Sequence, residues 1–157
     1  MKEKRTLNNS LMISVSGIRG IVGEAFTPEI ALEFGKAFGV FSNKGKIALG
    51  RDSRVTGDMI KSAVISGLLS MGCEVVDLGI VPTPTLLLYV KENDFDGGIV
   101  ITASHNPVEW NALKLVHKEG RFLNGNEGAE LLKIIMKKNI VMLPGMNIKS
   151  TLIMLMQ

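Results

Sequence analysis

The amino-acid sequence predicts a three-layer α/β/α domain with a mixed, mostly parallel sheet. Helical apolar stripes alternate with short apolar runs along the chain, which is typical of helices packed on both faces of a sheet. The last two predicted strands, at residues 99–102 and 113–117, are joined by a link too short for a helical crossover. These two strands are therefore expected to be antiparallel or unpaired, which makes the sheet mixed.

The first two helices have the clearest signals. Residues 27–29 are Thr-Pro-Glu, which supplies a capping hydroxyl, a proline at the first helical position and an acid in the first turn. The helix predicted over residues 28–41 then buries one stripe of side chains, formed by Ile30, Phe34, Ala37, Phe38 and Phe41. A second helix over residues 57–71 keeps the same spacing, with Thr56 or Asp58 as its cap.

The remaining elements follow in order. Apolar and β-branched runs predict four strands, at residues 46–50, 74–78, 99–102 and 113–117. Thr83 and Pro84 open a third helix that runs to about residue 91, and a fourth helix is expected over about residues 127–138. Residues 104–111 form a polar loop between the last two strands.

The chain has 157 residues, about one domain. We expect one domain over residues 1–140. Residues 141–157 hold four of the nine methionines and a single charge, Lys149, and show no clean period. Two interpretations of this tail stay open: an apolar segment docked on the domain, or an end that is not native because the gene is truncated or frameshifted.

Composition excludes several function classes. The net charge is only +3, and no stretch gathers more than a few Lys or Arg, so we expect no nucleic-acid partner. No apolar run is long enough to span a membrane, and the N-terminus lacks a signal peptide, which predicts a cytoplasmic protein. The single cysteine, Cys73, rules out an internal disulfide and is expected to be a buried, inert thiol.

Four polar features could carry chemistry. Residues 16–20 hold Arg19 between glycines, residues 50–54 and 102–107 directly follow predicted strands, and Lys114 lies just beyond the second loop. In open α/β sheets, ligands bind in the crevice outside the strand ends. Arginine, lysine and histidine side chains together with loop N–H groups suit a phosphate. The residues alone therefore predict a phosphate-binding α/β domain.

Each feature also has a purely structural interpretation. Arg19 would be part of a surface turn, and Arg51 would form a local ion pair with Asp52. Asn106 would order the backbone of its own loop, and Lys114 would be a solvated strand residue.

The motifs together resemble a known family. Residues 102–107 (Thr-Ala-Ser-His-Asn-Pro), followed by residues 110–114 (Trp-Asn-Ala-Leu-Lys), closely resemble the phosphoserine loop of the α-D-phosphohexomutases. This family includes phosphoglucomutase, phosphomannomutase and phosphoglucosamine mutase. Residues 16–20 look like its N-terminal Gly-x-Arg-Gly segment and residues 50–54 like its Gly-Arg-Asp-x-Arg loop. The 110–114 segment is most similar to members of the phosphoglucosamine mutase and phosphomannomutase types.

The resemblance implies an intramolecular phosphotransferase that moves phosphate between the 6- and 1-positions of a hexose phosphate through a bisphosphorylated sugar. It implies that Ser104 carries the phosphate and that this phosphate is a ligand of Mg²⁺. Lys114 would be the general acid/base or charge partner. Arg19, His105 and Asn106 would bind the transferring phosphate.

The chain covers only the first of the four domains that such enzymes have. The Asp-rich metal loop, the sugar-specificity loop and the final phosphate-binding loop of the other domains have no counterpart here. We therefore expect these 157 residues to be inactive by themselves, and the sugar is left undetermined. The alternative is a non-catalytic module that binds a phosphate ligand or a full-length mutase. A serine hydrolase is set aside, since the chain lacks a nucleophile elbow.

Overall fold

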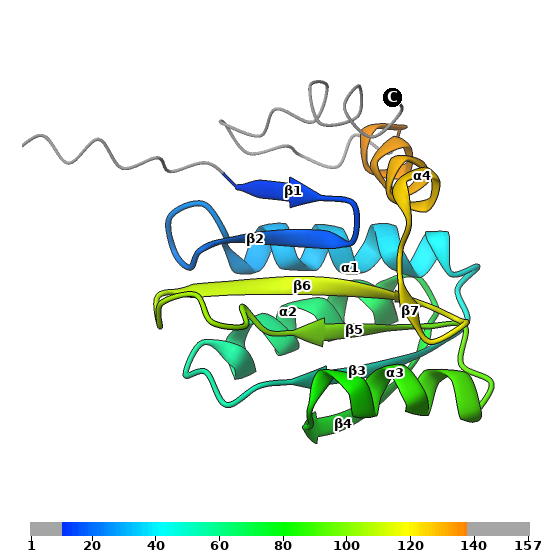
Figure 1. Ribbon diagram of the computed structural model, residues 1–157. Coiled ribbons are helices and arrows are strands. Elements are labelled where there is room, and N and C mark those ends of the chain that lie inside the picture. The colour runs from blue at the N-terminus through cyan, green and yellow to red at the C-terminus, as the bar shows by residue number, and fades with distance from the viewer. Residues whose placement is uncertain (1–10, 138–157) are drawn as a thin grey trace, which may run out of the picture.

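The computed structural model describes residues 11–137, which form a seven-stranded sheet with four helices (Figure 1). In chain order the elements are β1 (Met12–Ser14), β2 (Gly17–Ile21), α1 (Pro28–Phe41), β3 (Lys46–Arg51), α2 (Gly57–Ser70), β4 (Glu74–Ile80), α3 (Thr83–Glu92), β5 (Gly97–Ile101), β6 (Trp110–His117), β7 (Arg121–Phe122) and α4 (Gly125–Lys137).

The sheet is mixed, as the sequence predicts. Its order is β1-β2-β6-β5-β3-β4, and β7 pairs with β6. Strand β3 lies parallel to both β4 and β5, whereas β5 and β6 are antiparallel, in agreement with their short link. Among the four strands predicted from the sequence, two of the three pairings are therefore parallel. Strands β1, β2 and β7, which were not predicted, add three antiparallel pairings. Four of the six pairings between the described strands are thus antiparallel, and the expectation of a mostly parallel sheet is wrong.

Helices cover both faces of the sheet, which gives the three predicted layers. On one face α1, α2 and α4 bury the larger core, whose biggest fully buried side chains include Phe34, Phe38, Leu49, Ile60 and Leu113. Among the described helices, only α3 packs on the other face, where it lies on β3 and β5 and buries a smaller core around Leu86 and Val90 (Figure 1). Because α3 packs on β3 and β5, residues of β2 and β6 on its side are available for a site.

Glycines allow the close packing of α1 against α2. A Cβ atom on Gly67 would overlap the carbonyl group of Leu32, and one on Gly35 would lie 2.7 Å from the carbonyl oxygen of Val64. Each glycine faces backbone of the other helix, so the two axes approach more closely than larger residues would allow. The closely packed pair α1 and α2 shares one core with Ile47 and Leu49 of β3.

The predicted bounds of the first two helices are correct to within a residue, but one of their caps differs. At α1 the Thr27 hydroxyl accepts a hydrogen bond from the Ile30 N–H (3.4 Å), as expected for a cap. At α2 Thr56 occupies the cap position without capping. Its hydroxyl instead accepts from the Asn111 side-chain amide (2.9 Å), which ties the start of α2 to the start of β6.

Helix α4 begins two residues earlier than predicted because its first turn is closed by a reciprocal cap. The Glu127 N–H donates to Asn124 Oδ1 (3.0 Å), and the Asn124 N–H donates to Glu127 Oε2 (2.8 Å). This pair of bonds satisfies two backbone donors at the helix start. The asparagine-x-x-glutamate spacing is visible in the sequence and is a signal that the analysis overlooked.

The predicted surface turn around Arg19 is wrong. Residues 17–21 form strand β2, which pairs with β6 along its whole length, and β1 extends the sheet beyond it. Gly17 makes this pairing possible, since a Cβ atom there would overlap the Leu113 carbonyl oxygen. The strand was missed because it is short and glycine-rich and because its partner lies about ninety residues further along the chain.

Cys73 is buried, as predicted. It lies in the larger core with 6% of its surface exposed, and burial raises the pKa of its thiol above the ordinary range. The thiol is therefore uncharged near neutral pH, which fits the inert role expected for it.

None of the described helices is both long and apolar enough to cross a membrane. The predicted tail at residues 141–157 and the predicted domain boundary at residue 140 lie outside the residues that the structure describes.

Candidate functional site

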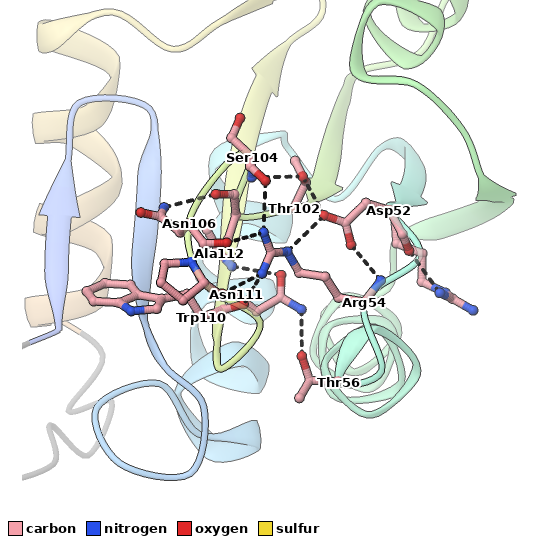
Figure 2. A network of polar contacts seen from close by, with 12 residues as sticks. Asp52, Arg54, Thr56, Thr102, Ser104, Asn106, Trp110, Asn111 and Ala112 are labelled. Atoms are coloured by element: carbon pink, nitrogen blue, oxygen red, sulfur yellow. Dashed lines mark hydrogen bonds and ion pairs between the residues drawn. The ribbon is translucent and has the colours of Figure 1, made fainter.

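The polar loops after β3 and β5 lie side by side at one edge of the sheet (Figure 2). The two strands are parallel and end together, since Arg51 pairs with Ile101. Just beyond them the Asp52 N–H donates to the Ile101 carbonyl (3.0 Å). Strand β6 is antiparallel to β5 and therefore begins, at Trp110, at the same edge. Topology thus gathers three segments that are far apart in the sequence.

Ser104 has an unusual backbone conformation in this cluster. Its φ is +55°, in the left-handed region that non-glycine residues rarely adopt and that recurs at functional sites. Its N–H donates to the Thr102 hydroxyl (3.2 Å), and its carbonyl accepts from Arg54 (2.8 Å). The residue is exposed, so this conformation presents the hydroxyl to solvent.

Lys114 lies against that hydroxyl. Its neighbours Leu113 and Leu115 point into the larger core, so the alternation along β6 puts Lys114 on the face that carries α3. The half-buried side chain turns toward the loop, where Nζ donates to Ser104 Oγ (3.3 Å). The ammonium group also lies 5.8 Å from the ring centroid of Phe122. A cation is thus held beside the exposed serine.

Arg19 approaches the same region from β2. It pairs with Ala112, and Gly17 pairs with Lys114 two positions along the strands, so Arg19 and Lys114 lie on one face of the sheet. The two side chains line a hollow of about 270 Å³. Arg19 is exposed and makes no hydrogen bond to Ser104 within residues 11–137. Among the described residues, Lys114 is therefore the one predicted cation that contacts the serine hydroxyl.

His105 and Asn106 follow the serine and behave differently. The His105 side chain is exposed and hydrogen-bonds to no described residue. The Asn106 amide donates to the Ala103 carbonyl (2.9 Å), and the Asn106 N–H donates to the same oxygen (3.1 Å). Asn106 therefore orders the backbone of its own loop, which is the structural role considered above, whereas His105 is free to meet a ligand.

The arginines of residues 50–54 are not free for phosphate, in contrast to the prediction. Arg51 forms an ion pair with Asp58 (3.0 Å) and donates to the backbone carbonyl of Asp52 (2.9 Å). The Asp52 carboxylate is paired with Arg54 instead (3.2 Å), so the predicted Arg51–Asp52 pair is wrong. Arg54 turns into the serine loop (Figure 2). Sequence reasoning missed this role because the loop carbonyls that Arg54 binds lie about fifty residues away.

Comparison with known families decides what this site belongs to. The family model described as "Phosphoglucomutase/phosphomannomutase, alpha/beta/alpha domain I" matches residues 11–140. The chain belongs to this family. The match covers the sheet, all four described helices and the serine loop, and it corresponds to one domain of the family.

Named relatives agree with this assignment. The chain is 50% identical over 110 residues to a phosphoglucosamine/phosphogalactosamine mutase of Sulfurisphaera tokodaii, which covers 69% of this chain and 24% of the relative. It is 50% identical over 109 residues to a phosphoglucomutase/phosphomannomutase of Thermococcus kodakarensis, covering 66% and 24%. A solved family structure from Burkholderia thailandensis superposes with a TM-score of 0.69 at 30% identity, covering 81% of this chain and 31% of that one.

This domain I therefore spans between a quarter and a third of the length of these relatives. Their names refer to different sugars although their identities to this chain are the same. These two matches therefore do not distinguish between the sugars.

Side chains of the described domain do not build a magnesium site. Within residues 11–137, no three His, Cys, Asp or Glu side chains gather as a metal centre. The Asp52 carboxylate, which belongs to the serine-loop cluster, already accepts hydrogen bonds from Arg54 and from the Thr102 hydroxyl. Mg²⁺ demands several oxygen ligands in octahedral geometry. The described side chains alone therefore do not provide the ligand set that Mg²⁺ needs.

A second arginine network lies at the start of α4. The Arg121 guanidinium forms two parallel bonds of 2.9 Å to the Glu127 carboxylate and a third to Glu119. His117 Nε2 lies 3.6 Å from Glu127 Oε1. The hydrogen bonds from Arg121, followed by that from the Asn124 N–H, lower the pKa of Glu127 to about 2, against the opposing effect of burial. This network joins β7 to the reciprocal cap of the helix.

Proposed function

We propose that this chain is the phosphoserine-bearing domain of a phosphohexomutase that interconverts hexose 6-phosphates and hexose 1-phosphates through a bisphosphorylated sugar. One observation carries the proposal: the exposed Ser104 hydroxyl is held in a left-handed turn with the Lys114 amine 3.3 Å away. Phosphoryl transfer depends mainly on positioning and on charge stabilisation, and this arrangement supplies both.

Ser104 is the proposed phosphoryl carrier. In the transfer to substrate, the bond between Ser104 Oγ and phosphorus breaks and a bond between a sugar hydroxyl oxygen and phosphorus forms. The hydroxyl proton is lost, and Oγ regains a proton. Lys114 is the described group close enough to deliver that proton or to offset the charge on Oγ. In the reverse transfer the amine takes the proton back.

Arg19 and His105 are the proposed ligands of the transferring phosphate. Both are exposed on the approach to Ser104, and Arg19 shares a hollow with Lys114. An arginine fork matches phosphate oxygens well, and a phosphoserine adds about −1.5 to −2 charge that such cations offset. The contacts of Asn106 support a different role, the ordering of the serine loop.

Turnover is proposed to need further domains. Mg²⁺ would share the serine phosphate with ligands from outside this chain, since the described side chains build no metal centre. The chain also spans only about a quarter of its named relatives. We propose that the sugar is an amino-sugar phosphate of the phosphoglucosamine type or a mannose or glucose phosphate, since residues 110–114 are similar to members of both types.

A chimeric enzyme tests this function. Residues 11–140 replace the matching segment of the Sulfurisphaera tokodaii relative, and the product is assayed with glucosamine 6-phosphate, mannose 1-phosphate and glucose 1-phosphate. Each assay contains Mg²⁺ and the matching sugar bisphosphate. We expect turnover, and a phosphoryl group on Ser104 found by peptide mass spectrometry.

The Ser104→Ala chimera is the control, and it should show no turnover on any substrate. A folded chimera that is inactive on all three sugars, beside an active parent enzyme, would contradict the catalytic proposal. If such a chimera still bound inorganic phosphate, the non-catalytic module would become the better account. Undiminished turnover by Ser104→Ala would refute the phosphoserine assignment.

A further inference from the structure

We infer that Arg54 is a positioning residue, which acts with Asp52 and Thr102 to hold Ser104 in the conformation that brings its hydroxyl to Lys114. The inference rests on the proposed function only in taking Ser104 as the reacting hydroxyl. The contacts that support it are within one domain and do not depend on any ligand.

Arg54 uses every one of its side-chain N–H donors in this cluster. The Nε–H donates to Asp52 Oδ2 (3.2 Å), and the other four bonds go to loop carbonyls. Those acceptors are Pro107 (2.7 Å), Trp110 (3.1 Å), Ser104 (2.8 Å) and Asn106 (2.8 Å). A guanidinium has five N–H donors, so none is left for a phosphate. The side chain, only 12% exposed, is thus the centre of the folded loop.

The same network holds the serine on both sides of its α-carbon. The Ser104 carbonyl accepts from Arg54, while its N–H donates to the Thr102 hydroxyl (3.2 Å). That hydroxyl donates to Asp52 Oδ2 (2.7 Å), the oxygen that Arg54 also binds (Figure 2). The bonds close a ring through the serine, which restricts both of its backbone angles.

This ring explains how a non-glycine residue stays at φ +55°. A left-handed serine is strained and persists only where its surroundings over-determine it. A lysine at residue 54 could not replace the arginine, because an ammonium is a point donor without the planar fork that reaches four carbonyls. Without the fork, the loop is expected to relax and Ser104 Oγ to leave the amine of Lys114.

Arg51 provides a matched control. It lies three residues earlier, and its side chain is 14% exposed, close to the value for Arg54. It pairs with Asp58 and makes no hydrogen bond to residues 103–110. A lysine at either position keeps the positive charge. The two variants therefore differ in one respect: only Arg54→Lys removes hydrogen bonds to the serine loop.

The test is NMR spectroscopy on the 157-residue chain. A positive φ gives a strong HN–Hα NOE within the residue, which reports the conformation of Ser104 directly. Amide exchange of Ser104, Asn106 and Trp110 reports the order of the loop. We expect Arg54→Lys to lose the NOE and to speed exchange at these three amides at least tenfold, and Arg51→Lys to change neither. A strong NOE and unchanged exchange in Arg54→Lys would overturn the inference.

Chemical rescue separates positioning from general loss of structure. In Arg54→Ala, millimolar guanidinium should restore the Ser104 NOE and the amide protection, whereas the same concentration of ethylammonium should not. Equal rescue by both cations would show that the planar donor geometry of the guanidinium group is not required. If the Arg54 variants lose protection in α1 as well, Thr102→Val decides the question, because it removes the acceptor of the Ser104 N–H and the donor to Asp52 but leaves Arg54 in place. Retention of the NOE in a folded Thr102→Val protein would then overturn the inference.

The two proposals fail in different ways. In the active chimera, Arg54→Lys should lower kcat about a hundredfold with KM little changed, since misplacement of a reacting group has effects of that size. A chimera without phosphoryl transfer would contradict the proposed function and leave the NMR result standing. An active chimera with normal kcat in Arg54→Lys would contradict only the positioning role.

Discussion

Two hydrogen-bond networks in this domain are each centred on an arginine, but they stabilise different kinds of structure. Arg54 is almost fully buried and gives four of its five bonds to backbone carbonyls, three in the serine loop and one at Trp110, where β6 begins. Arg121 is 42% exposed and binds mainly the carboxylates of Glu119 and Glu127. The first network holds an uncommon backbone conformation, and the second secures the start of a regular helix.

The difference shows that an arginine can either fix the conformation of a loop or stabilise the end of a helix, depending on its partners. Carbonyls of a loop have no partner of their own, so a buried guanidinium that satisfies them decides the shape of that loop. Arg121 itself is 42% exposed and its partner Glu119 is 61% exposed, so water can replace part of what is lost when Arg121 is removed. The comparison predicts effects that differ in size and in their response to pH and salt.

The largest expected effect is on turnover, and it follows from the loss of Lys114, which contacts the Ser104 hydroxyl. In the active chimera, Lys114→Ala should lower turnover by several orders of magnitude, since it removes the cation 3.3 Å from Ser104 Oγ. Steady-state kinetics measures the loss, and thermal unfolding should show little change. Lys118→Ala, an exposed lysine just beyond β6, is the control and should retain activity. Similar losses in both variants would argue against a specific role for Lys114.

The next effect compares the two arginines by stability. Arg54→Ala leaves four loop carbonyls and the Asp52 carboxylate without their partner, which should cost about 3 kcal/mol of unfolding free energy. Arg121→Ala should cost less, because the Arg121 side chain and its partner Glu119 are already largely in water. Urea unfolding of the chain measures both values. Equal losses would remove the distinction drawn between the networks.

A smaller effect concerns pH. The folded pKa of Glu127 is about 2, below its ordinary value of 4.5, so ionised Glu127 stabilises the fold above pH 4.5. That stability, on the order of 1–2 kcal/mol, should be lost as pH falls from 4.5 to 2. Urea unfolding across this range should show a shallower decline in Glu127→Gln than in the wild type. Parallel curves for the two proteins would contradict the lowered pKa.

The smallest effect is the response to salt. At about 1 M NaCl the screening length falls to roughly 3 Å, so the cost of Arg121→Ala should largely vanish. The cost of Arg54→Ala should persist, because the Arg54 side chain is buried and binds neutral carbonyls. Unfolding free energies at low and high salt test this. A stronger salt dependence for Arg54→Ala would reverse the comparison.

The sequence by itself determined the elements whose signal is local. Helix α1 occupies the predicted residues 28–41, because its cap, its proline and its apolar stripe all lie within that segment. The succession of strands β3 to β6 along the chain was also predicted from local patterns, and the short link between β5 and β6 restricted these two strands to an antiparallel pair or no pairing. The motif around Ser104 pointed to the right family, since its residues are contiguous or nearly so.

Only the tertiary structure decided the features that need a partner far along the chain. Strand β2 exists because Gly17 can lie against β6, about ninety residues later. The role of Arg54 depends on backbone carbonyls some fifty residues away. Because every residue type has a backbone carbonyl, no sequence pattern identifies these acceptors. The same holds for the left-handed Ser104, because strain at one residue is sustained by bonds that folding brings together.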